Sequence, residues 1–146
     1  MSNAAGAAGY SGTPLAKKLG IKAGHELAVL GAPDGFAIDD LPDGVTVRHQ
    51  ARGPLDVIVS FHTRRADLAK RTTTLLKALP PDGSLWVAWP KKASGMPTDI
   101  TEDVVREVLL PTGMVDNKVC AIDATWSGLR LVLRKELRPG RTTAAN

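Results

Sequence analysis

Two runs of this sequence, LDVIVSF at 55–61 and SLWVAWP at 84–90, are apolar on both faces of an extended chain. A strand with this pattern is covered on both sides by other elements, which is typical of central strands in a parallel sheet. The segment between them predicts a helix with Thr63 as its cap, residues 80–83 as its end, and one apolar face made of Leu68, Leu75, Leu76 and Leu79. The order strand, helix, strand therefore predicts two parallel strands joined by a crossover helix.

Shorter elements are expected before these strands. A helix is predicted to start with Thr13 as N-cap and Pro14 at the first helical position, and to end at Gly20. Strands are predicted at 26–31 and at 45–49, separated by turn-forming residues. The segment between those two strands is too rich in Gly and Pro to hold a long helix.

A second long helix is predicted after the strand at 84–90. Asp99 with Glu102 three residues later resembles a capping box, and Ile100, Val104 and Val108 fall on one face. Two strands, at 117–124 and 128–134, close the chain and must be antiparallel because only three residues connect them.

These elements alternate in the manner of an α/β protein. We predict an open, Rossmann-like, mostly parallel sheet with helices on both faces and a C-terminal antiparallel hairpin. The single domain is expected to span 13–136, with flexible tails at 1–12 and 137–146 that are rich in Ala, Gly and other small or turn-forming residues.

Composition narrows the class of protein. The chain has 146 residues, 43% of them apolar and 23% charged, as in an ordinary globular domain. It has no apolar stretch of about 18 residues that could span a bilayer. Its first residues lack the basic start and apolar run of a secretory signal, and the single cysteine, Cys120, cannot form an internal disulfide. We therefore expect a cytoplasmic protein.

The net charge of +4 is unevenly distributed, with a basic segment from Arg130 to Arg141. Such a segment attracts nucleic acid weakly through its phosphates. The aromatic residues do not alternate with basic ones as single-strand binders require, and charges at the end of a terminal strand are usually solvated. Nucleic acid is therefore not the partner that we expect, and membrane binding is not expected either.

The stretch 55–134 resembles the C-terminal half of the Rossmann-like methyltransferase fold. The order of strands and helices is similar, and LPPDG at 79–83 is similar to the Leu-x-Pro-Gly-Gly turn of that superfamily. The resemblance implies an S-adenosylmethionine site with a glycine-rich turn after the first strand and an acid at the end of the second. This chain departs from that pattern, with Pro33 inside the turn and Arg48 and His49 at the second strand end, so the relative is a contracted one.

A second resemblance covers most of the domain. The stretches GYSGTPLAKKLGI at 9–21, WVAWPKKASGMPTDITEDVVRE at 86–107, VDNKVCAID at 115–123 and WSGLRLVLR at 126–134 are similar to a small actinobacterial family that is a domain of unknown function. This resemblance implies a source class and a fold, and it brings no activity with it.

Candidate ligand-binding residues follow the predicted parallel strands. Ligands of open α/β sheets bind beyond the carboxyl ends of the strands, and that edge is expected to carry Gly31, His62, Lys91, Lys92, Ser94 and Gly95. Two cations, a hydroxyl and the free N–H groups of the next helix would suit a phosphate, a nucleotide or a carboxylate. The order Lys-Lys-Ala-Ser-Gly is not a P-loop, because the glycines of that loop precede its lysine. The alternative is a solvated turn before a helix that Asp99 already caps.

Other candidates are weaker. Trp126, beside Ser127 and Gly128, is expected on a turn, where it could bind a protein partner or pack over the sheet edge. The three histidines lack a ligand spacing, so no metal is expected, and Cys120 is expected to be a small core residue. No Gly-x-Ser-x-Gly elbow marks a nucleophile.

The sequence thus predicts non-catalytic binding of an anionic small molecule or a protein partner and predicts no cofactor, and it leaves the oligomeric state open. The alternative is an S-adenosylmethionine-dependent methyltransferase-like enzyme with an altered cofactor site.

Overall fold

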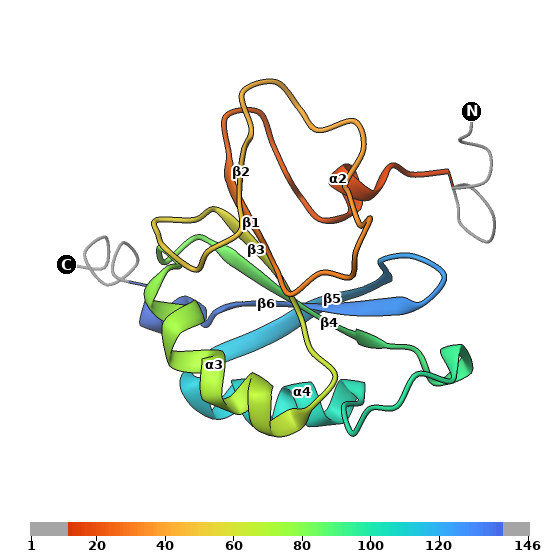
Figure 1. The fold of residues 1–146 in the computed structure, drawn as a ribbon. Coiled ribbons are helices and arrows are strands. Elements are labelled where there is room, and N and C mark those ends of the chain that lie inside the picture. Colours follow the sequence, from red (N-terminus) through yellow and green to blue (C-terminus); the bar gives the residue numbers. More distant parts are fainter. Residues whose placement is uncertain (1–11, 139–146) are drawn as a thin grey trace.

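The two apolar runs form central strands of a six-stranded sheet in the computed structural model, which describes residues 12–138 (Figure 1). The strands in chain order are β1 (Glu26–Leu30), β2 (Thr46–Arg48), β3 (Val57–Phe61), β4 (Ser84–Pro90), β5 (Met114–Ala121) and β6 (Trp126–Leu133). In space their order is β2-β1-β3-β4-β6-β5. The first four are parallel, and β6 is antiparallel to both β4 and β5, which confirms the α/β class with a closing hairpin.

The α-helices are α2 (Leu15–Lys18), α3 (Arg65–Lys77) and α4 (Glu102–Leu109), and the short 3₁₀ turns are η1 (Lys92–Ser94), η2 (Leu110–Thr112) and η3 (Lys135–Leu137). The crossover from β3 through α3 to β4 is as predicted. Leu137 belongs to η3, so the last turn reaches one residue past the predicted domain end, and most of both predicted tails lies outside the described residues. No helix within 12–138 has the length and hydropathy needed to cross a membrane.

Every residue of β3 and β4 is buried, and this burial divides the protein into two cores. The core on one face lies between the sheet and helices α3 and α4, and contains Ile58, Leu75 and Leu85. The core on the other face contains Val59 and Trp86. Each fully buried aliphatic side chain contributes about 1.5–3 kcal/mol relative to exposure, so these strands contribute much of the folding free energy.

The second face is covered differently from the first. In Figure 1, α2 and the long connection between β1 and β2 lie over it, and Phe36, Ile38 and Leu41 of that connection pack against the core. Trp86 donates a hydrogen bond from Nε1 to the carbonyl of Leu19, 3.0 Å away, which attaches α2 to the sheet. The connection is interrupted by Gly and Pro, so it forms no long helix. Irregular chain therefore covers most of the second face, whereas helices cover the first.

Three predicted helix N-caps are wrong. The corrections matter for the loops at the carboxyl ends of the strands. Pro14, not Thr13, occupies the N-cap position of α2, and Arg64, not Thr63, occupies that of α3. The N-cap of α4 is Thr101, whose hydroxyl accepts a hydrogen bond from the amide of Val104 at 3.2 Å. The capping-box prediction for Asp99 therefore fails.

Asp99 acts on the other helix. Its Oδ1 accepts a hydrogen bond from the amide of Arg65 at 2.6 Å, so it satisfies the start of α3 from a distant part of the chain. The hydroxyl of Thr98 and the amide of Asp99 both donate to the carbonyl of Thr63, at 2.6 and 3.3 Å. Residues 98 and 99 thus attach the chain entering α4 to the chain entering α3. Sequence spacing could not show this, because the groups are more than 30 residues apart.

The remaining differences are shifts along the chain. The α4 face that is fully buried carries Val105 and Leu109, whereas the predicted Val104 and Val108 are only partly buried beside it. The hairpin strands begin earlier than predicted, so Trp126 is the first residue of β6 and not part of a turn.

We expect Asp99→Ala to lower the free energy of unfolding by about 1 kcal/mol, because the Arg65 amide loses its acceptor. Hydrogen exchange at that amide should become faster, while the Val104 amide keeps its rate. Thr101→Ala is the matched control and should show the reverse pattern at the two amides. Faster exchange at Val104 alone in Asp99→Ala would contradict the assignment of Asp99 to α3.

Candidate functional site

The carboxyl ends of β1 and β3 meet where the chain reverses its direction across the sheet. From β1 the chain moves outward to β2, then returns past β1 to β3, and open α/β sheets bind ligands at such a switch point. Gly31 directly follows β1 with a φ of +68°, and a Cβ there would lie 3.0 Å from the carbonyl oxygen of Phe61. Gly31 therefore lets the two strand ends approach each other, which explains this residue without a ligand.

Three aromatic rings pack together on one side of this switch point. Phe36 packs edge-to-face on Phe61 with ring centroids 4.9 Å apart, and Phe61 packs in the same way on Trp126 at 5.0 Å. Trp126 is only 6% exposed, so little of its ring surface is open to a partner. Packing against the sheet, the alternative weighed for this tryptophan, accounts for its position.

A buried hydrogen-bond chain occupies the other side. His62 is 4% exposed and lies between the hydroxyl of Ser60, 2.7 Å from Nε2, and the carboxylate of Asp67, 2.7 Å from Nδ1. The carboxylate can only accept, so Nδ1 carries the proton and Nε2 accepts from the hydroxyl. Burial lowers the pKa of His62 from its usual 6.5, against the opposing effect of Asp67.

Ser60, His62 and Asp67 have the residue types of a hydrolytic triad, but they lie in a different setting. A serine nucleophile must reach its substrate, and Ser60 is only 1% exposed. Asp67 lies in the first turn of α3, where its charge also interacts favourably with the helix dipole. We therefore assign Ser60, His62 and Asp67 to the junction between β3 and α3, and His62 is not placed to contact an anion in solvent.

The loop 91–97 is held at both ends and projects from the sheet edge (Figure 1). The Lys91 amide donates to the carbonyl of Thr125 at 2.7 Å, and the far end is held through Thr98 and Asp99 as described above. Residues 92–97 are all exposed. The loop thus presents its side chains to solvent, whereas the sequence left open whether they line a cleft.

Ser94 and Gly95 have local structural roles in this loop. The Ser94 hydroxyl donates to the Lys91 carbonyl at 2.7 Å and accepts from the Met96 amide at 3.2 Å. Gly95 ends η1 in the left-handed region, with a φ of +74°. Of the predicted ligand set, Lys91 and Lys92 are the side chains without such a role, and neither forms an ion pair within residues 12–138.

The end of β2 offers no acid for a ribose. Arg48 pairs with Glu26 at 2.8 Å, and His49 Nδ1 lies 3.2 Å from the carbonyl oxygen of Val29. His25 Nδ1 accepts from the Lys22 amide. Within the described part of the chain, no group of three or more His, Cys, Asp or Glu residues could hold a metal ion.

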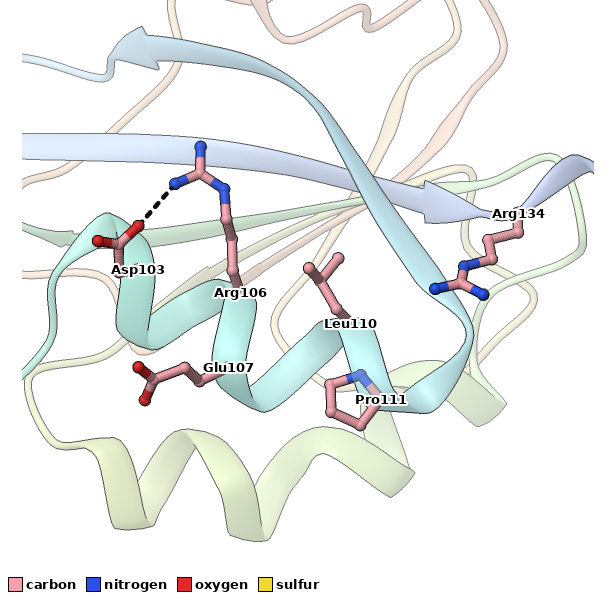
Figure 2. Close-up of a pocket in the computed structure, with 6 residues that line it drawn as sticks. All are labelled: Asp103, Arg106, Glu107, Leu110, Pro111 and Arg134. Atoms are coloured by element: carbon pink, nitrogen blue, oxygen red, sulfur yellow. Dashed lines mark hydrogen bonds and ion pairs between the residues drawn. The ribbon is translucent and has the colours of Figure 1, made fainter.

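An ion-pair network that the sequence analysis missed lies beside α4. Arg106 pairs with Glu102, with Asp103 at 3.0 Å and with Asp116 of β5 at 3.1 Å, and the carboxylates of Glu102 and Asp116 raise the pKa of Arg106. A shallow hollow of about 540 Å³ lies next to it, lined by Asp103, Arg106, Glu107, Leu110, Pro111 and Arg134 (Figure 2). The i,i+4 spacing of Glu102 and Arg106 could have indicated one of these pairs.

This hollow is unlike a binding pocket because the charged side chains of α4 that line it are already paired within the protein. Arg106 already has its carboxylate partners, and Glu107 pairs with Arg65 of α3 at 2.5 Å. A second hollow, of about 320 Å³, also touches Arg106 and lies against β5. Neither hollow is lined by Gly31, His62 or Lys91.

Comparison with known proteins supports the fold and brings no residue-level match. No family model and no curated protein matches the sequence. A SAM-dependent methyltransferase from Aquifex aeolicus is similar with a TM-score of 0.57 and 16% identity, over 79% of this chain and 85% of that one. TrmN from Thermus thermophilus has a TM-score of 0.55 and 12% identity, over 82% of this chain and 47% of that one.

A third solved structure is the magnesium protoporphyrin IX methyltransferase ChlM from Synechocystis PCC 6803, with a TM-score of 0.53 and 10% identity over 82% of this chain and 74% of that one. The chain spans about half the length of TrmN and most of the length of the other two. At such identities the likeness concerns the fold alone, and it confirms the predicted Rossmann-like methyltransferase architecture. The resemblance to an actinobacterial family stays a prediction.

The buried His62 should make stability depend on pH. Because its pKa is lowered in the folded protein, the unfolded chain binds the proton more readily, so stability is retained above pH 6.5 and is lost as the pH falls below it. In His62→Gln, which has a donor and an acceptor but does not titrate, this part of the loss should disappear. Urea unfolding at about pH 7.5 and about pH 5.5 measures the difference.

His25 and His49 are present in both proteins, so the comparison isolates the effect of His62. An equal loss of stability in the wild type and in His62→Gln would show that His62 does not carry the effect.

Proposed function

We propose that this protein is a non-catalytic binding module that recognises an acidic protein partner through the loop 91–97. The observation that carries the proposal is the combination of fixed ends with two lysines, Lys91 half-buried and Lys92 exposed, in this loop. Lys91 and Lys92 have no carboxylate partner within the described chain, and the loop ends are held by hydrogen bonds to Thr125 and Thr63. Binding loops on rigid scaffolds commonly have this arrangement.

The shape of the loop favours a protein over a small molecule. Small-molecule sites are concave and bury most of the ligand surface, whereas residues 92–97 project into solvent. Met96, which is 39% exposed beside the lysines, adds a flexible apolar contact of the kind found on protein-binding surfaces. A carboxylate-bearing surface would pair with the lysines and cover this methionine.

Two features of the switch point support a non-catalytic role. The rings of Phe36, Phe61 and Trp126 pack together where related sheets bind ligands, and His62 is committed to Ser60 and Asp67. His62, at the end of β3, is therefore neutral and buried. A general base would instead need to lie within hydrogen-bond reach of a bound substrate.

We expect affinity purification from the native cells to yield an acidic protein with the wild type and not with Lys91→Glu/Lys92→Glu. Calorimetry of the two purified proteins should show direct binding that weakens with added salt and falls at least about tenfold in the double variant. Lys70→Glu/Lys77→Glu makes the same change in charge on α3 and is the control. Equal binding by both double variants would refute the role of the loop.

A second candidate is an S-adenosylmethionine-dependent enzyme, which the methyltransferase neighbours support at the level of the fold. Because Phe36 and Phe61 pack together at the switch point and Arg48 stands where an acid is needed, we expect no heat on titration with millimolar S-adenosylmethionine or S-adenosylhomocysteine. One-to-one binding of either compound would favour this candidate.

A further inference from the structure

A second surface, separate from the loop 91–97, carries cations that face one another. Lys118 of β5 and Arg130 of β6 are direct partners across the antiparallel hairpin, so their side chains lie on the same face of the sheet. Lys118 Nζ donates to the carbonyl of Lys18 at the end of α2, 3.2 Å away, and Arg138 lies close enough to help lower the pKa of Arg130, after burial. We call Lys118, Arg130 and Arg138 the basic face.

The cations of the basic face lack the carboxylate partners that two arginines have on the other side of the sheet. Arg65 and Arg106, which lie on the α3 and α4 side, are paired with carboxylates. Within residues 12–138 no ion pair includes Lys118, Arg130 or Arg138. Like charges directly opposite on neighbouring strands destabilise a sheet. Lys118 donates to the Lys18 carbonyl and Arg130 to Asn117 Oδ1, and neither acceptor carries a negative charge that would offset the repulsion.

The strand that carries Lys118 is open along its outer side. β5 is the last strand of the sheet, and its outward main-chain groups can pair with an added strand. A register shift between Asp116 and Lys118 divides β5, which leaves 118–121 as its regular second half. Val119 in this half is 53% exposed, which is high for a valine in a strand.

We infer that an extended acidic segment of a partner protein adds to β5 along 118–121 and places its carboxylates against the basic face. Main-chain hydrogen bonds would supply affinity and the alternate side chains would supply specificity, as in other cases of strand addition. Acidic residues facing Lys118 and Arg130 would remove their mutual repulsion. Apolar residues on the other side of the added strand would cover Val119.

Charge and composition argue against two other occupants. A second copy of this chain added edge to edge would bring the basic face against itself, so its own cations would repel. Single-stranded nucleic acid needs exposed aromatic platforms, and Trp86, Trp89 and Trp126 are all buried. The acidic peptide satisfies both the charge and the open strand edge.

The test uses a fluorescein-labelled peptide of alternating glutamate and valine, titrated with the full chain at low ionic strength. Fluorescence anisotropy should show binding that salt weakens and that Lys118→Glu or Arg130→Glu reduces at least about tenfold, whereas Lys70→Glu on α3 changes the affinity less than about twofold. Hydrogen exchange should slow at 118–121 in the complex. Lys118→Gln serves as a milder variant if charge reversal disturbs folding, which thermal unfolding will show.

Several results would overturn the inference. These are no binding by the wild type at millimolar protein, an equal loss of affinity in Lys70→Glu, or unchanged exchange at 118–121. A labelled oligothymidylate of the same charge that binds more tightly than the peptide would reassign the basic face to nucleic acid. If the wild type dimerises at high concentration and Val119→Asp abolishes the dimer, the edge would be reassigned to a second copy.

Discussion

The burial of β3 and β4 on both faces is the constraint on which the rest of this structure depends. Because both strands are fully buried, each face of the sheet needs its own cover, and the chain supplies two helices on one side and the short helix α2 with irregular segments on the other. Parallel strands also require a crossover, which α3 provides. The carboxyl ends of β1, β3 and β4 are thereby gathered at one edge, and the loops that follow them are brought together there.

The chemistry of that edge is decided by packing. The connection after β1 returns over the sheet and sets Phe36 against Phe61, while Ser60, His62 and Asp67 join β3 to α3 through hydrogen bonds. Side chains of the protein itself therefore occupy a position where related folds bind ligands. The residues that we propose for recognition are the cations of the projecting loop and, further along the sheet, those of the basic face.

Charge is distributed differently on the two sides of the sheet. On the side of α3 and α4, Arg65 and Arg106 have carboxylate partners drawn from α4 and β5. On the side of α2, Lys118 and Arg130 oppose each other without one. Internal stability accounts for the first arrangement, and an external acidic partner would account for the second.

The sequence by itself determined the elements whose residues interact with near neighbours. Alternation and helical periodicity indicated β3, α3, β4 and the closing hairpin, because these patterns reflect which side of a single element is buried. Only the tertiary structure decided which groups meet across the chain. Asp99 accepts a hydrogen bond from the Arg65 amide at the start of α3 and does not cap α4. Trp126 is buried against Phe61. Lys118 lies opposite Arg130 because an irregularity in β5 sets the register of the hairpin. Each of these contacts joins segments whose distance depends on how the whole sheet is assembled, and no local spacing encodes that distance.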